Sequence, residues 1–176
     1  MSAPALDPVR LRASRRLFLR VAASAPLAIG LDAAAFAAPS EENDLSILSA
    51  AIALESEAIG LYGDALRRDL VPSGLRDYAV EFKGAHEGHR DTQIEILRER
   101  GLEPPSPHRA DPMRASMAGD RVIRQLLAIE FAAESAYLGL IGRIRTSDYL
   151  LSAAFIVVDE ARHQTIWRRA LGLSIY

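Results

Sequence analysis

The sequence predicts an all-α protein, a bundle of four helices in which a long crossover joins the second helix to the third. Of the 176 residues, 49% are hydrophobic but only 6% are aromatic, and the content of Ala, Leu, Ile, Glu and Arg favours helix over sheet. Apolar residues recur at helical spacing in four segments. Four prolines lie between the second and third of these segments, too many for one helix to continue.

Charge and cysteine usage narrow the classes of function. The formal net charge is −2 and Lys83 is the only lysine among 21 basic residues, so the sequence offers no basic patch for a nucleic acid. Cysteine is absent, which excludes disulfides and thiolate metal sites. Any metal would therefore be held by histidine and carboxylate side chains, which suit iron, manganese or zinc.

Residues 1–37 are predicted to be a twin-arginine export signal, which leaves residues 38–176 as one domain. A Ser-Arg-Arg-Leu-Phe-Leu motif at Arg15 and Arg16 precedes a mildly apolar run and a small-x-small cleavage site that ends at Ala37. An uncleaved membrane anchor is the alternative, but the run is interrupted and shorter than the ~20 apolar residues of a span. We therefore expect the twin-arginine translocation machinery to export the chain and the mature form to be periplasmic or otherwise exported, without spanning the membrane.

The first helical hairpin follows this signal. Ser40 can cap a helix over about residues 41–69, because an acidic first turn and apolar residues at helical spacing come next. Ser73 can cap the second helix, which is expected to stop at Gly101, a typical residue just past a helix end.

The second hairpin comes after the proline-rich crossover of residues 102–119. Helices are expected over residues 120–145 and from the cap Ser147 to about Ala170, before Gly172. The crossover is long enough to carry the chain back along the bundle, so the two hairpins can pack side by side.

The two hairpins look alike in sequence. Glu55 is followed seven residues later by Tyr62, and Glu130 by Tyr137. Seven residues are close to two helical turns, so in each helix the glutamate and the tyrosine share a face. A repeated hairpin with an approximate two-fold axis is the simplest explanation.

Six side chains on facing helices are candidate metal ligands. Glu55 and His89 are equidistant from the first predicted turn, and Glu130 and His163 from the second, so each pair should lie level across an antiparallel hairpin. Glutamate and histidine three residues apart on the fourth helix share one face, as do two histidines on the second. The predicted ligands are Glu55, His86, His89, Glu130, Glu160 and His163.

The apolar neighbours of Glu130 and Glu160 indicate that these acids are buried. Two carboxylates ~4 Å apart repel by about 4 kcal/mol at an effective dielectric near 20, so several of them inside a bundle need a cation or protons. A pair of metal ions would supply the charge. The alternative without metal is a bundle with internal Arg–Glu pairs, for which Arg90, Arg121 and Arg162 are available.

Three further side chains lie on the same faces as the candidate ligands. Tyr62 and Tyr137 could donate hydrogen bonds to ligand carboxylates, although buried tyrosines are as often core aromatics whose hydroxyl reaches the surface. Glu134 follows Glu130 by one turn and is at most an auxiliary ligand.

With these residues in place, the sequence resembles the ferritin-like superfamily over residues 44–172, most closely its rubrerythrin-like and twin-arginine-exported bacterial members. The resemblance implies a ferritin-like four-helix bundle with a long crossover and two metal ions. Iron is the first choice, with manganese or a mixed iron–manganese pair as alternatives.

The resemblance also implies a role for each ligand. Glu55 and His89 would serve one ion, and Glu130 and His163 would serve the other. Glu160 would bridge both ions.

The second helix departs from the family pattern. Where the pattern has Glu-x-x-His, this chain has His86-x-x-His89. Since a neutral imidazole offers one lone pair to one ion, we expect His86 to be a terminal ligand on the same ion as His89, or its close neighbour. The site would then lose one bridge and one negative charge.

The leading functional hypothesis is an exported non-haem protein with a dinuclear metal centre, of the ferroxidase or peroxidase type, that oxidises Fe(II) with O2 or peroxide or removes peroxide. A non-catalytic metal-binding or stress-related bundle is the second hypothesis, and a structural partner protein with salt-bridged acids is the third. The oligomeric state stays open, with a homodimer among the options.

Overall fold

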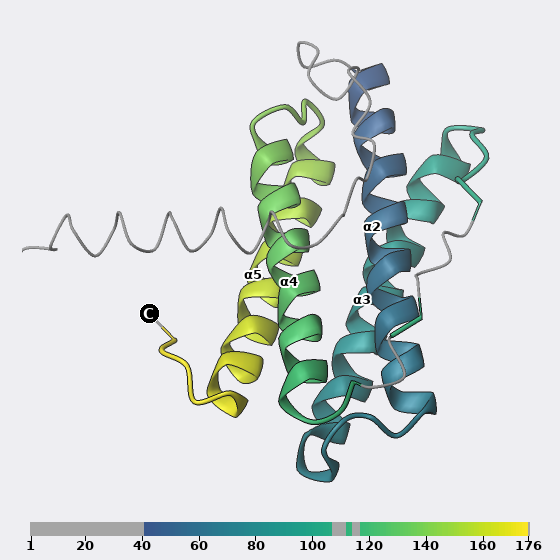
Figure 1. The fold of residues 1–176 in the computed structure, drawn as a ribbon. Helices are drawn as coiled ribbons and strands as arrows, with labels where there is room; N and C mark the ends of the chain where they lie inside the picture. The colour runs from purple at the N-terminus through teal and green to yellow at the C-terminus, as the bar shows by residue number, and fades with distance from the viewer. Residues whose placement is uncertain (1–40, 107–111, 114–116, 176) are drawn as a thin grey trace, which may run out of the picture.

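The structure is a computed structural model that describes residues 41–106, 112–113 and 117–175 (Figure 1). The predicted export signal and its cleavage site lie outside the described residues, as does the predicted cap Ser40.

Four long helices form the described part of the chain, and no strand occurs within it, which confirms the all-α class. A short 3₁₀ helix, η2, precedes the second long helix. The elements are α2 (Glu41–Arg67), η2 (Ser73–Leu75), α3 (Arg76–Glu99), α4 (Asp120–Ile141) and α5 (Ser147–Ala170).

The helices pair as two hairpins. Helix α2 packs along α3 and α4 along α5, and the hairpins meet mainly through α2 and α4 (Figure 1). Among the described helices, α2 has the length and composition to cross a membrane. More than half of its apolar window is buried inside the bundle, however, as in the core helix of a soluble protein.

The core is aromatic at one level of the bundle. Tyr62 of α2, Phe82 of α3 and Trp167 of α5 are fully buried, and they pack against aliphatic residues of α4. Burying a side chain such as Phe82 contributes roughly 1.5–3 kcal/mol. This layer lies directly beside the polar centre described below, since Phe82 stacks on the ring of His163 at 3.9 Å between centroids.

Asp64 of α2 forms hydrogen bonds that link α2 to the crossover. Its Oδ2 accepts hydrogen bonds from the backbone N–H of Met113 at 3.0 Å and from the guanidinium of Arg68 at 2.8 Å. Arg68 also donates to the carbonyl of Met113, whose side chain is buried in the core. Burial alone would raise the pKa of Asp64, but the hydrogen bonds from Arg68 and Met113 hold it below the ordinary value.

Asp44 joins the start of α2 to the turn between α4 and α5. This buried carboxylate accepts hydrogen bonds from the backbone N–H groups of Arg145 and Thr146, both at 2.9 Å, and from the Thr146 hydroxyl at 2.7 Å. The third helix therefore ends at Ile141, short of the expected Arg145, because the following residues turn toward Asp44.

Two of the three predicted serine caps, Ser73 and Ser147, are wrong. Ser147 is the first residue of α5, and the cap position is held by Thr146, whose hydroxyl is engaged by Asp44. Ser73 likewise begins η2, and Leu75 precedes α3. Neither α3 nor α5 has a side-chain capping hydrogen bond at its cap position.

Candidate metal centre

Each of the four helices contributes to one polar cluster inside the bundle. Helix α2 provides a glutamate, α3 two histidines, α4 a glutamate, and α5 a glutamate and a histidine. Five of the side chains are fully buried, and His89 keeps 14% of its side chain exposed. The cluster contains all six residues that the sequence singles out: Glu55, His86, His89, Glu130, Glu160 and His163.

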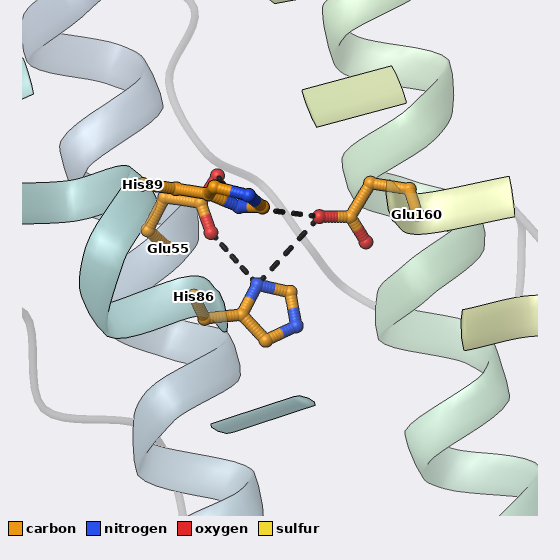
Figure 2. A group of neighbouring side chains, drawn as sticks. All are labelled: Glu55, His86, His89 and Glu160. Carbon is orange, nitrogen blue, oxygen red and sulfur yellow. Dashed lines mark hydrogen bonds and ion pairs between the residues drawn. The ribbon is translucent and has the colours of Figure 1, made fainter. Parts of the chain in front are cut away.

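The first group within this cluster consists of Glu55, His86, His89 and Glu160 (Figure 2). Nδ1 of His86 lies 2.8 Å from Oε2 of Glu55 and 3.6 Å from Oε1 of Glu160. Nδ1 of His89 lies 3.7 Å from Oε1 of Glu55 and 3.9 Å from Oε1 of Glu160. Donors bound to one ion at bond lengths of about 2.0–2.2 Å stand roughly 3–3.5 Å apart, so a metal ion fits among them after small shifts.

The second group consists of His86, Glu130, Glu160 and His163. Nε2 of His86 lies 3.4 Å from Oε2 of Glu130. Nδ1 of His163 lies 3.2 Å from the same Glu130 oxygen and 3.9 Å from Oε2 of Glu160. Glu160 and His86 therefore belong to both groups, and the two Glu160 oxygens face different ones.

Electrostatics in the cluster favour a cation. Neither oxygen of Glu160 has a hydrogen-bond partner, although the side chain is fully buried. Burial, and then the neighbouring Glu130, raise the pKa of Glu160 far above its ordinary value. Nδ1 of His89, the ring nitrogen that faces the first group, is likewise buried without a hydrogen-bond partner. Unpaired carboxylate oxygens and imidazole nitrogens are the donors that iron, manganese and zinc accept.

The histidines partly compensate the acids. Burial would lower the pKa of His86, but the carboxylates of Glu130 and Glu55 raise it to about 10. Burial would in turn raise the pKa of Glu55, but His86 and His89 bring it down to about 2. An imidazolium between two carboxylates is thus the electrostatic counterpart of a cation at the same place.

Two tyrosines donate hydrogen bonds to ligand glutamates, each to the glutamate of the other hairpin. Tyr62 of α2 donates a hydrogen bond to Glu130 of α4, and Tyr137 of α4 donates one of 2.5 Å to Glu55 of α2. Both hydroxyls are buried inside the bundle and do not reach the surface. Burial, and then the nearby glutamate charge, raise the pKa of each tyrosine, so both hydroxyls stay protonated as donors.

The remaining sequence candidates lie outside the cluster. Glu134 is half-buried and accepts a 2.8 Å hydrogen bond from Gln164, and it belongs to neither ligand group. Arg90 pairs with Asp91 at the surface. Arg162 pairs with the exposed Glu81, and Arg121 is exposed. The three arginines therefore do not neutralise the buried glutamates, and the partners of Glu55 and Glu130 are histidines and tyrosines.

Sequence reasoning missed three residues that support the cluster. Gln93 donates to the Tyr137 hydroxyl at 2.6 Å, and Trp167 Nε1 donates to the Tyr62 hydroxyl at 2.7 Å. Each lies four residues after a ligand histidine, a spacing that the helical period could have revealed. Asp159 lies 3.2 Å from Nε2 of His89, and its place beside Glu160 in the chain gave no such signal.

A surface groove of about 400 Å³ reaches the cluster at His89. His89 is the one member of the cluster that is partly exposed, so this is where the centre meets solvent. The lining residues come from α3 and α5: His89, Thr92, Asp148, Leu151, Ser152, Phe155, Ile156 and Asp159.

Comparison with known proteins agrees with the fold. The chain is similar to a conserved hypothetical protein from Mycobacterium tuberculosis whose crystal structure is known. The two share 26% sequence identity and superpose with a TM-score of 0.66, covering 74% of this chain and 98% of the other. No curated protein matches the chain. The family model of the ferritin-like domain matches residues 43–173, so the chain belongs to the ferritin-like family.

Proposed function

We propose that the buried cluster holds two metal ions, iron in the first place, and that the protein oxidises Fe(II) with O2 or peroxide, or removes peroxide, after export. The observation that carries the proposal is Glu160, a fully buried carboxylate with two unpartnered oxygens, each facing a different ligand group. Iron would supply the one-electron changes that none of these side chains can undergo easily.

The chain's own residues perform the other tasks. Tyr62 and Tyr137 orient the glutamates of α4 and α2, and the surrounding core excludes bulk water. The groove at His89 offers a small oxidant or an ion a short way to the centre. A low-dielectric surrounding of this kind strengthens every charge interaction at the site.

The predicted export signal supports the same proposal. The twin-arginine motif at Arg15 and Arg16 is similar to signals that carry folded proteins, often with cofactors already inserted. A metal centre buried inside a bundle is suited to loading before export, because the helices must pack before all ligands are assembled.

Metal content and single-turnover kinetics test the proposal together. Protein matured through its own export route should contain about two transition-metal ions per chain by elemental analysis. Anaerobic protein loaded with Fe(II) should then consume O2 or peroxide in a stopped-flow experiment faster than free Fe(II) does. Protein filled beforehand with Zn(II) is the control and should be inactive.

Two outcomes would contradict the proposal. Protein that retains two ions but reacts no faster than free Fe(II) would be a non-catalytic metal-binding bundle. If the protein retains no metal under any loading condition, the cluster is not a metal centre.

A further inference from the structure

The two ring nitrogens of His86 face different ligand groups. Nδ1 lies toward Glu55 and Glu160 of the first group, at 2.8 Å and 3.6 Å. Nε2 lies 3.4 Å from Glu130 of the second group. Figure 2 shows the Nδ1 side of the ring directed between Glu55 and Glu160, with the other ring nitrogen pointing away from both.

His89 shows how a terminal ligand looks in the same centre. A histidine that binds one metal ion usually gives its second ring nitrogen to a carboxylate, a carbonyl or water outside the ligand set. Nδ1 of His89 faces the first group, and its Nε2 lies 3.2 Å from Asp159, which belongs to neither group. For Nε2 of His86, the nearby carboxylate is Glu130, itself a candidate ligand.

The charge balance of the site also favours metal binding through both nitrogens of His86. The replacement of a glutamate by a neutral histidine would leave three glutamates against two divalent ions. A histidine ring that binds metal through both nitrogens carries no N–H proton and has one negative charge. This charge replaces that of the missing glutamate.

We infer that His86 bridges the two metal ions, binding one through Nδ1 and the other through Nε2. The inference rests on the proposed function only in requiring two ions. When the second ion binds, the remaining ring N–H proton goes to solvent and two nitrogen–metal bonds replace the two N–H bonds. The bridge takes the place of the carboxylate that the ferritin-like pattern has at this position, and the expectation of a terminal His86 is revised accordingly.

Nitrogen-15 NMR of the Zn(II)-loaded protein tests the bridge directly, because zinc is diamagnetic and the readout needs no turnover. The protein is labelled at histidine and carries His108→Gln, so that three histidines remain. We expect ring N–H signals from His89 and His163 only, and two metal-shifted ring nitrogens for His86. A terminal His86 would add a third N–H signal and would overturn the inference.

Two variants guard against misassignment. With His86→Glu, a carboxylate bridge is available and the two N–H signals should persist, whereas a terminal His86 predicts a fall from three to two. With His89→Gln, the bridge predicts a fall from two to one, and a terminal His86 again predicts three to two.

The zinc content of the same samples separates this inference from the proposed function. Two zinc ions together with three ring N–H signals would overturn the bridge alone and leave the two-ion centre standing. Fewer than two zinc ions at saturation in the protein that carries His108→Gln alone would overturn the bridge and the dinuclear centre together.

Discussion

The hydroxyl of Tyr137 on α4 donates a 2.5 Å hydrogen bond to the carboxylate of Glu55 on α2, which belongs to the other hairpin. Gln93 of α3 donates to the same hydroxyl, so three helices meet at one oxygen atom. The hydroxyl therefore links the packing of the hairpins to the orientation of a candidate ligand.

Tyr137→Phe should weaken both folding and metal binding. The variant keeps the ring but removes the hydrogen-bond partner of Oε1 of Glu55 and of Nε2 of Gln93, which costs about 1–3 kcal/mol of unfolding free energy. Loss of a group that orients a ligand typically lowers metal affinity ~10–100-fold. Urea unfolding of the metal-free protein and Zn(II) competition titrations measure the two effects. Tyr149→Phe, at a buried tyrosine outside the centre, is the control, and equal losses in both variants would refute the assignment.

Glu160→Ala should release metal more completely than Glu134→Ala. Glu160 faces both ligand groups, whereas Glu134 belongs to neither and is held by Gln164. Elemental analysis after exhaustive dialysis is the measurement. Equal metal retention in the two variants would leave no ground for placing Glu160 between the ions.

Asp64→Asn should remove part of the protein's stability near neutral pH, by about 1 kcal/mol, because a neutral amide replaces the carboxylate that accepts the charged hydrogen bond from Arg68. The pKa of Asp64 is lowered in the folded state, so its contribution is fully present above the ordinary value of 3.8 and is lost as pH falls through the folded pKa. Urea unfolding of the metal-free wild-type protein and the variant should therefore differ most near neutral pH and converge in acid. Asp69→Asn is the control, because Asp69 is exposed. Its free energy of unfolding should equal that of the wild-type protein at every pH.

Leu151→Trp should slow metal uptake without changing the final amount bound. Leu151 lines the groove at His89 and is 57% exposed, so a larger side chain there narrows the approach and leaves the core intact. Stopped-flow uptake of Co(II), followed by its absorbance, gives the rate. Leu138→Trp is matched in exposure, at 55%, but lies on α4 and does not line the groove. Equal rates in the two variants would show that ions reach the centre elsewhere.

Replacing Arg15 and Arg16 together with lysine should leave the precursor in the cytoplasm, because the pair is the address that the translocation machinery reads. Cell fractionation and immunoblotting measure this. Arg10→Lys and Arg12→Lys together, outside the motif, should leave export unchanged. Normal periplasmic accumulation of the Arg15 and Arg16 variant would contradict the export signal.

The helices and the six clustered residues could be predicted because both follow from the helical period. A spacing of three residues places Glu160 and His163 on one face, and symmetric distances from a turn place Glu55 level with His89. The cap of α5 could not be predicted, because Thr146 is held by Asp44 from a distant part of the chain. The orientation of the His86 ring was beyond the sequence for the same reason, since it depends on carboxylates from three other helices.

The crossed tyrosine pairs bear on how such a protein could have arisen from a duplicated hairpin. Tyr62 serves the glutamate of the second hairpin and Tyr137 serves the glutamate of the first. A solitary hairpin would therefore lack the donor for its own glutamate and could obtain it only from a second copy of itself. An ancestral single hairpin would have had to assemble as a pair before it could build the centre, and fusion of two copies would then have preserved that pairing within one chain.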